Sequence, residues 1–280
     1  MIEKAKTNIQ DVFSGFWDKI NLKNQHENYG ELIWMLAKTD FKLRYHGSVL
    51  GYIWALLKPL LTFAVLNFVF SSIFNPRNTG VDTYSLQLLS GLVMFYFFAE
   101  GTSSGLASLI SKSQLVKKIY VPRWTIILAS TINATLIFLM NLLVVAVFFV
   151  VKGFMPSFLA IGMFFVFSVF LYVVILSFSL LAAPLYVKFR DLSMIWDVIL
   201  LIILYSSPII YPLSIIPAKF HALMLLNPFA FIVHFNKESL INKHFANPGQ
   251  YAMFIFIVLA FFALSIFSYR KFIPKIAEDI

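Results

Sequence analysis

Residues 125–151 read TIILASTINATLIFLMNLLVVAVFFVV, a run without a single Asp, Glu, Lys or Arg. A hydrocarbon core of ~30 Å takes about 20 helical residues to cross, so this run is long enough to span a bilayer. It does not alternate apolar and polar residues as the strands of a membrane β-barrel do, whereas a helix satisfies its own backbone hydrogen bonds in lipid. We therefore expect a transmembrane helix here and an all-α fold.

The composition extends this conclusion to the rest of the chain. Of its 280 residues, 60% are hydrophobic and only 12% are charged, and the mean hydropathy is +0.84. Soluble domains carry about 25% charged residues, so the polar residues are too few to cover a soluble fold of this length. The sequence predicts a polytopic membrane protein with six transmembrane helices, at residues 50–74, 86–110, 125–151, 157–184, 193–212 and 251–269.

Basic residues predict the orientation of these helices. Most of the 22 Lys and Arg residues lie in four segments, residues 1–58, 111–124, 185–197 and 270–280. The alternate loops contain only Arg77, Lys152, Lys219, Lys237 and Lys243. Because cytoplasmic loops are enriched in basic residues, we expect both termini in the cytoplasm. The net charge of +9 thus reflects topology, and we expect no nucleic-acid partner.

Two segments outside the six helices have patterns of their own. Residues 29–46 alternate apolar and basic residues at helical spacing, which predicts an amphipathic helix at the cytoplasmic interface. Such a helix can be a lipid anchor or a docking surface for a soluble partner.

Residues 212–250 are apolar but interrupted by Pro217 and Pro228. They fit re-entrant half-helices that form an outer gate or line a path, or alternatively a loop that lies on the outer leaflet.

The chain shows no pattern typical of an enzyme or a metal site. It has no Cys, and its five His residues lack the paired spacing of metal ligands. A phosphate-binding loop of the form G-x-x-x-x-G-K-[ST] is impossible, because Gly is never followed by Lys. If ATP drives this protein, we expect a different polypeptide to bind the nucleotide.

Polar and aromatic residues inside the expected spans are candidates for a transport path. Glu100 lies in the middle of the second span, where a carboxylate that faced lipid would cost about 2.5 to 3.5 kcal/mol. It either lines a path or makes structural hydrogen bonds between helices. Tyr96, Tyr172, Trp196 and Tyr205 combine flat apolar faces with polar tips, and they either face a path or belong to the core.

Several local strings resemble one family. In chain order they are RYHGSVLGYIW at 44–54, KPL at 58–60, LVKKIYVPR at 115–123, FRDL at 189–192, SPIIYP at 207–212 and LNPF at 226–229. Together they resemble the ABC-2 type permeases that export polysaccharides, over about residues 29–270. The first string is more similar to O-antigen and capsule exporters than to teichoic-acid exporters.

The resemblance implies a function and its partners. It implies a homodimer that pairs with two copies of a separate P-loop ABC ATPase and exports a lipid-linked, O-antigen-like polysaccharide across the bacterial inner (cytoplasmic) membrane. This chain would be a transport subunit without a catalytic site or cofactor, and the partner would bind ATP and Mg. The implied regions are a cytoplasmic N-terminus at 1–48, a transmembrane domain at 49–270 and a cytoplasmic tail at 271–280. Within the transmembrane domain, the resemblance implies cytoplasmic loops at about 111–124 and 185–193 and a re-entrant segment at about 212–250.

The resemblance also implies roles for individual residues. Those expected to contact the ATPase are Lys117, Lys118, Pro122, Arg123, Phe189, Arg190 and Asp191. Alternatively, the basic residues of this set only determine topology, and Pro122 only starts the next helix. By charge alone, Lys42 and Arg44 are candidates for contact with the phosphate of a lipid headgroup.

Three other interpretations remain open from the sequence. The same fold can export teichoic acid, capsule, or a small lipid or drug. An ion-coupled transporter can use Glu100 as its proton site. A membrane-embedded lipid or sugar transferase would need clusters of acidic or His residues at an interface, and the sequence offers none.

Overall fold

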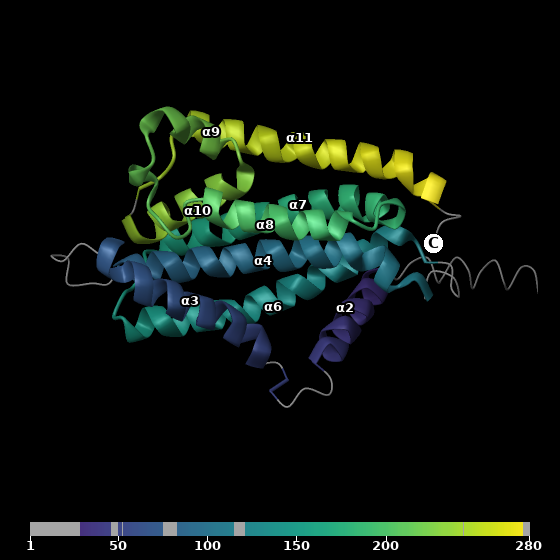
Figure 1. The fold of residues 1–280 in the computed structure, drawn as a ribbon, viewed down its shortest axis with the longest axis horizontal. Helices are drawn as coiled ribbons and strands as arrows, with labels where there is room; N and C mark the ends of the chain where they lie inside the picture. The colour runs from purple at the N-terminus through teal and green to yellow at the C-terminus, as the bar shows by residue number, and fades with distance from the viewer. Residues whose placement is uncertain are drawn as a thin grey trace, which may run out of the picture.

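Helices form every regular element that the structure describes. The structure is a computed structural model, and it describes residues 29–45, 50–51, 53–74, 83–114, 121–242 and 244–276. The principal helices are α2 (Tyr29–Tyr45), α3 (Ile53–Phe74), α4 (Thr83–Ser111), α6 (Arg123–Val151), α7 (Phe158–Lys188), α8 (Leu192–Ser206), α9 (His221–Leu225), α10 (Pro228–Lys237) and α11 (Pro248–Phe272) (Figure 1). The expected all-α class is confirmed.

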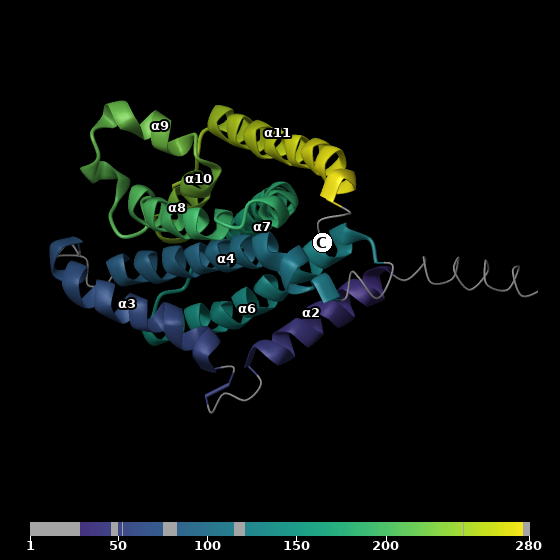
Figure 2. The same cartoon turned by 45° about the vertical axis from the view of Figure 1, so that its right-hand side comes forward.

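Helix α4 runs through the middle of the bundle. It packs against α6 on one side and α7 on the other, and it also contacts α3 and α8 (Figures 1 and 2). Helix α11 covers α7. Helix α2 lies across the first part of α6, where Ile33 and Ala37 are buried against Ala129. In both views α2 and the end of α11 lie at one end of the molecule, while α9 and α10 lie at the other.

Small residues let α4 and α7 approach closely. A Cβ atom added to Gly105 would lie 2.0 Å from Oγ of Ser179, and one added to Gly101 would lie 2.6 Å from Cγ2 of Ile175. Both distances are far below van der Waals contact, so only Gly fits at these positions. Close backbone contact of this kind is a main source of helix association where lipid removes the hydrophobic driving force.

The expected spans are confirmed in part. By length and hydropathy α3, α6, α7 and α11 can each cross a membrane. A fifth crossing is added if Ala218–Leu225 and Pro228–Asn242, which meet at a bend of 112°, count as one broken span. The fifth expected helix was predicted to reach residue 212, which is wrong: α8 ends at Ser206, because the residue before Pro208 is driven out of the helical conformation and Ser207 is extended.

We predict that Gly105→Ala destabilises the bundle. The new methyl group overlaps Ser179, and overpacking of this kind costs about 1–3 kcal/mol. The midpoint of thermal unfolding of the purified chain in detergent should therefore fall. Gly162→Ala on α7 is the control, since its Cβ would have no neighbour within 4 Å. Equal midpoints for the two variants would contradict the proposed close packing.

Candidate functional site

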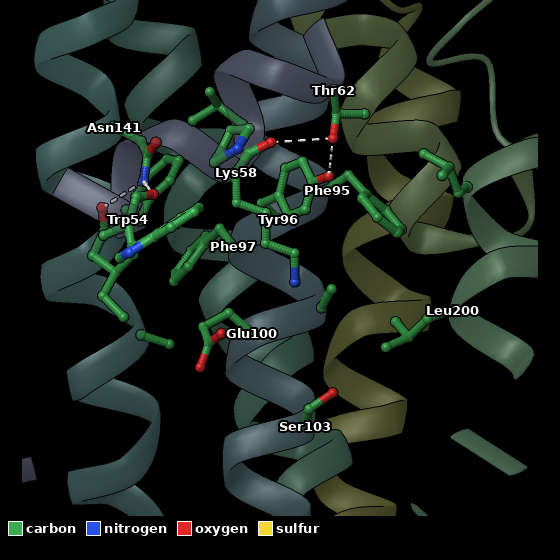
Figure 3. Close-up of a pocket in the computed structure, with 18 of the residues that line it drawn as sticks. Trp54, Lys58, Thr62, Phe95, Tyr96, Phe97, Glu100, Ser103, Asn141 and Leu200 are labelled. Atoms are coloured by element: carbon green, nitrogen blue, oxygen red, sulfur yellow. Dashed lines mark hydrogen bonds between the residues drawn. The ribbon is translucent and has the colours of Figure 1, made fainter. Parts of the chain in front are cut away.

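A large pocket lies among α3, α4, α6 and α8. It has a volume of about 770 Å³ and is shown in Figure 3. Leu61 and Leu201 line it and are 56% and 57% exposed, so the pocket opens between α3 and α8. The polar residues in its lining are Arg44, Lys58, Thr62, Tyr96, Glu100, Ser103, Asn141 and Asp197.

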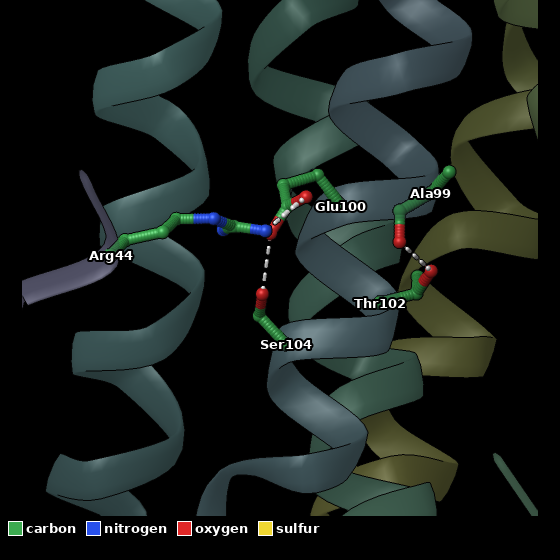
Figure 4. Close-up of polar contacts among 5 residues, drawn as sticks. All are labelled: Arg44, Ala99, Glu100, Thr102 and Ser104. Atoms are coloured by element: carbon green, nitrogen blue, oxygen red, sulfur yellow. Dashed lines mark hydrogen bonds and ion pairs between the residues drawn. The ribbon is translucent and has the colours of Figure 1, made fainter. Parts of the chain in front are cut away.

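Glu100 is paired with a cation from α2. Arg44 forms an ion pair with the carboxylate through Nη1, and its Nη2 donates a hydrogen bond of 2.8 Å to Oε2 (Figure 4). The hydroxyl of Ser104 donates to Oε1 at 2.7 Å. A guanidinium that meets both oxygens of a carboxylate is among the stronger protein ion pairs. Glu100 therefore both lines the pocket and holds α2 against α4.

A second ion pair joins the same two helices. The Nζ of Lys112, near the end of α4, contacts the carboxylate of Asp40 on α2. Asp40 and Arg44 lie one turn apart on α2, so successive turns of this helix are attached to α4. Arg44 was expected only as a headgroup contact, and neither pair was predicted from the sequence.

Lys58 and Tyr96 meet on the wall formed by α3 and α4. The Nζ of Lys58 lies 5.6 Å from the centre of the Tyr96 ring. The hydroxyl of Thr62 donates to the Lys58 carbonyl at 3.1 Å and lies 2.6 Å from the Tyr96 hydroxyl. Because Thr62 has one hydroxyl hydrogen, Tyr96 is the donor in the second bond. The pocket thus presents a cation, an aromatic face and ordered hydroxyl groups.

Asn141 replaces the hydrogen bond that Pro59 removes from α3. Pro59 has no N–H to donate to the carbonyl of Ala55, four residues earlier. The Nδ2 of Asn141 on α6 donates to that carbonyl at 3.4 Å and to Ile137 O at 2.9 Å. Asn141 is buried and interrupts an apolar run, and this interruption is the local signal by which the residue could have been found in the sequence.

Three of the expected path residues lie elsewhere. Tyr172 lies between α6 and α7, where its hydroxyl is 3.2 Å from that of Thr131. Trp196 is buried and donates from Nε1 to Oγ1 of Thr102 at 3.1 Å. Tyr205 is exposed on α8. Tyr96 and Glu100 are therefore the members of this expected set that the pocket brings together.

The expected coupling and headgroup residues are spread over several segments. Lys117 and Lys118 lie outside the described residues. Pro122 precedes α6, and Arg123 begins it and donates from Nη1 to Ile273 O at 3.2 Å. The exposed turn between α7 and α8 contains Phe189, Arg190 and Asp191. Lys42 is exposed on α2.

Lys237 has a structural role that its sequence position did not indicate. It is 4% exposed, and its Nζ donates hydrogen bonds to the carbonyls of Pro208 and Ile209 in the break after α8. Tyr84 on α4 donates to the next carbonyl, Ile210 O, at 2.9 Å. Side chains from α10 and α4 thus take over the hydrogen bonds that the interrupted helix cannot make.

We predict that Asn141→Leu destabilises the protein by about 1–3 kcal/mol, because the Ala55 carbonyl loses its donor. The loss should be smaller in a Pro59→Ala background, since residue 59 then supplies its own N–H. Thermal unfolding of the four combinations in detergent measures this coupling. A cost of Asn141→Leu that is equal in both backgrounds would contradict the assignment.

We also predict that Lys237→Met loosens the break after α8. The carbonyls of Pro208 and Ile209 would lose their donor, at a cost of about 1–3 kcal/mol for each buried group. Because the chain has no Cys, a single Cys at Ile209, which is buried, reports on this opening by its rate of thiol labelling. Labelling should accelerate in Lys237→Met and stay unchanged in Lys219→Met, which alters an exposed residue. Unchanged labelling in both variants would refute the role of Lys237.

Comparison with known proteins places this architecture in a family. Residues 31–235 match the family described as ABC-2 type transporter. The chain is 29% identical over 253 residues to an O-antigen export system permease protein RfbA of Klebsiella pneumoniae, covering 86% of this chain and 93% of the relative. It is 25% identical over 266 residues to the protein of the same name from Myxococcus xanthus, covering 93% and 100%. It is 22% identical over 242 residues to the polysialic acid transport protein KpsM of Escherichia coli, covering 83% and 90%. The chain therefore belongs to the ABC-2 type transporter family.

Proposed function

We propose that this chain is the transmembrane permease subunit of an ATP-driven ABC exporter that moves a lipid-linked, O-antigen-like polysaccharide across the inner membrane. The observation that carries the proposal is the similarity to O-antigen export permeases over almost their whole length. The similarity to a polysialic acid transport protein also favours a polysaccharide over a drug or a small lipid. Capsule and teichoic acid remain alternative cargoes within the same fold.

The chemistry of the main pocket suits such a cargo. Aromatic faces at Trp54 and Tyr96 can stack on the apolar C–H faces of sugar rings, while Thr62 and Asn141 lie beside them as polar groups. Lys58 adds a cation for the phosphate of a lipid carrier. Because the pocket opens between α3 and α8, we propose that two copies of the chain face each other there and enclose the path.

The proposed topology has six spans, with both termini in the cytoplasm. Helix α8 has 15 residues and rises roughly 22 Å, so it crosses the membrane only together with the segment after Ser206. Helix α4, with 29 residues, is long enough by itself. The bent pair of helices at residues 218–242 then lies in the outer half of the membrane as a re-entrant segment.

ATP hydrolysis would take place on two copies of a separate ABC ATPase, which also bind the ATP and Mg. We propose that the ATPase contacts the segment that contains Lys117, Lys118, Pro122 and Arg123, and the turn formed by Phe189, Arg190 and Asp191. Helix α2 packs against α6, which Arg123 begins, and is attached to the pocket through Arg44 and Glu100. Movement of the ATPases would therefore reach the pocket through α2 and α4.

The geometry of Glu100 favours this role over that of a proton carrier. Its carboxylate is held by Arg44 and Ser104 at the same time. An ion-coupled transporter that uses Glu100 would have to break this arrangement in each cycle.

Purification and deletion test the proposed function. We expect the chain to copurify in mild detergent with a P-loop ATPase at equal stoichiometry. Deletion of the chain, or loss of the ATPase's phosphate-loop Lys, should remove the polysaccharide from the cell surface and leave it inside the cell. Transport by the purified chain alone in liposomes would refute the proposal.

We predict that Arg44→Glu reduces polysaccharide export at least about tenfold, because two carboxylates then repel each other where α2 meets α4. The double variant Arg44→Glu/Glu100→Arg should recover most of the export, since it restores an ion pair of opposite sense. Lys42→Glu is the control, as it makes the same charge change at an exposed position of α2. Copurification of the ATPase with each variant shows whether the complex still assembles. If the double variant exports no more than Arg44→Glu, the pair does not transmit movement.

A further inference from the structure

A second pocket lies at the end of the molecule opposite α2. It has a volume of about 430 Å³, within the range of about 300–1,000 Å³ that is typical of small-molecule sites. Its lining comes from α9 and α10, the segments before and after them, and the start of α11. Its polar lining residues are His221, His234, His244, Asn247 and Gln250.

These side chains offer hydrogen-bonding groups. The Nε2 of His221 lies 2.8 Å from Ile216 O, and since a carbonyl only accepts, Nε2 carries the hydrogen, and Nδ1 is an acceptor in the uncharged form of the ring. The Oε1 of Gln250 accepts from the backbone N–H of Asn247 at 2.9 Å, which leaves its amide NH₂ as the group that it can offer to a ligand. The pocket therefore has both an acceptor and a donor on ordered side chains.

The rest of the lining points to a neutral ligand with apolar faces. None of the described lining residues is an Asp, Glu, Lys or Arg, so there is no fixed charge to select an ion. Leu213, Phe235 and Phe245 supply apolar surface beside the imidazole and amide groups. A sugar ring has this combination of hydroxyl edges and apolar C–H faces. Anionic groups such as phosphate, in contrast, are usually held by Arg, Lys or several backbone N–H groups.

We propose that this pocket binds a neutral sugar unit of the exported glycan on the outer side of the membrane. The proposal rests on the proposed function and adds a second contact point, which is separate from the main pocket. A bound sugar unit there bridges α9 to α11. The glycan would thus leave the protein along the bent pair of helices.

Site-specific photocrosslinking in cells tests this inference. A photoreactive benzophenone amino acid replaces His244, which is exposed at the rim of the pocket, in the full chain with its ATPase. Irradiation should attach glycan to the chain, detected as a mass ladder with a glycan-specific antibody. The same amino acid at Met155, between α6 and α7 and 75% exposed, is the control and should give little product. Equal product at both positions would overturn the proposal.

A second variant relates the crosslink to the hydrogen-bonding groups. His221→Leu removes the acceptor and keeps a side chain of similar size, so the glycan adduct at position 244 should fall about fivefold, the effect of one net hydrogen bond. Leu223→Ala, an exposed neighbour on α9, should leave the adduct unchanged. The amount of chain in the membrane is measured for each variant, so that a folding defect is recognised. An unchanged adduct in His221→Leu would overturn the assigned chemistry.

Two strains separate the failure of this inference from failure of the proposed function. In a strain that cannot polymerise the glycan, the adduct should disappear, and an adduct that persists would mean that the pocket holds a different ligand. In a strain that lacks the chain, surface glycan should be lost, and its persistence would refute the exporter itself. Loss of surface glycan on deletion, together with no adduct at position 244, would refute only the pocket.

Discussion

In lipid, every backbone N–H and C=O group needs a hydrogen-bond partner. Where a helix of this protein is interrupted, side chains from neighbouring helices supply these partners. Two interruptions lie next to the candidate sites. At Pro59, the Ala55 carbonyl, which has no donor within its own helix, accepts from Asn141, and this bond ties α3 to α6. After α8, the carbonyls of Pro208, Ile209 and Ile210 accept from Lys237 and Tyr84. The first interruption lies at a wall of the main pocket, and the second lies where the chain turns into the segment that forms the second pocket.

The helices could be predicted from the sequence because uninterrupted apolar length is a local property. The span expected at 125–151 is found at Arg123–Val151, and the interface helix expected at 29–46 is found at Tyr29–Tyr45. The end of α8 was placed too late because Pro208 stops the helix, and the break that follows is stabilised by Lys237, 28 and 29 residues away in sequence. From sequence alone, a Lys that is buried in the fold cannot be distinguished from other basic loop residues. Its neighbours in sequence do not indicate which carbonyls it will contact.

The main pocket could be predicted only where a polar residue stands out from an apolar run. Glu100 was identified in this way and Tyr96 as an aromatic ring with a polar tip, and both line the pocket. Tyr172 and Trp196 have the same composition signal, but they form hydrogen bonds inside the bundle with Thr131 and Thr102. Helix α7 is apolar around its whole circumference. Its sequence therefore has no periodicity that shows whether Tyr172 faces a path or the core. Arg44 could not be paired with Glu100 in advance, because 56 residues separate them.

The two ion pairs of α2 restrict how this helix can move. Asp40 and Arg44 are one turn apart, roughly 6 Å along α2, whereas their partners Lys112 and Glu100 are twelve residues apart, roughly 18 Å along α4. The long side chains of Arg44 and Lys112 bridge this difference, each from a different helix. A shift of α2 along α4 in either direction must therefore stretch one of the two pairs while it relaxes the other. The two pairs therefore tie α2 to the part of α4 that places Tyr96 and Glu100 in the wall of the pocket.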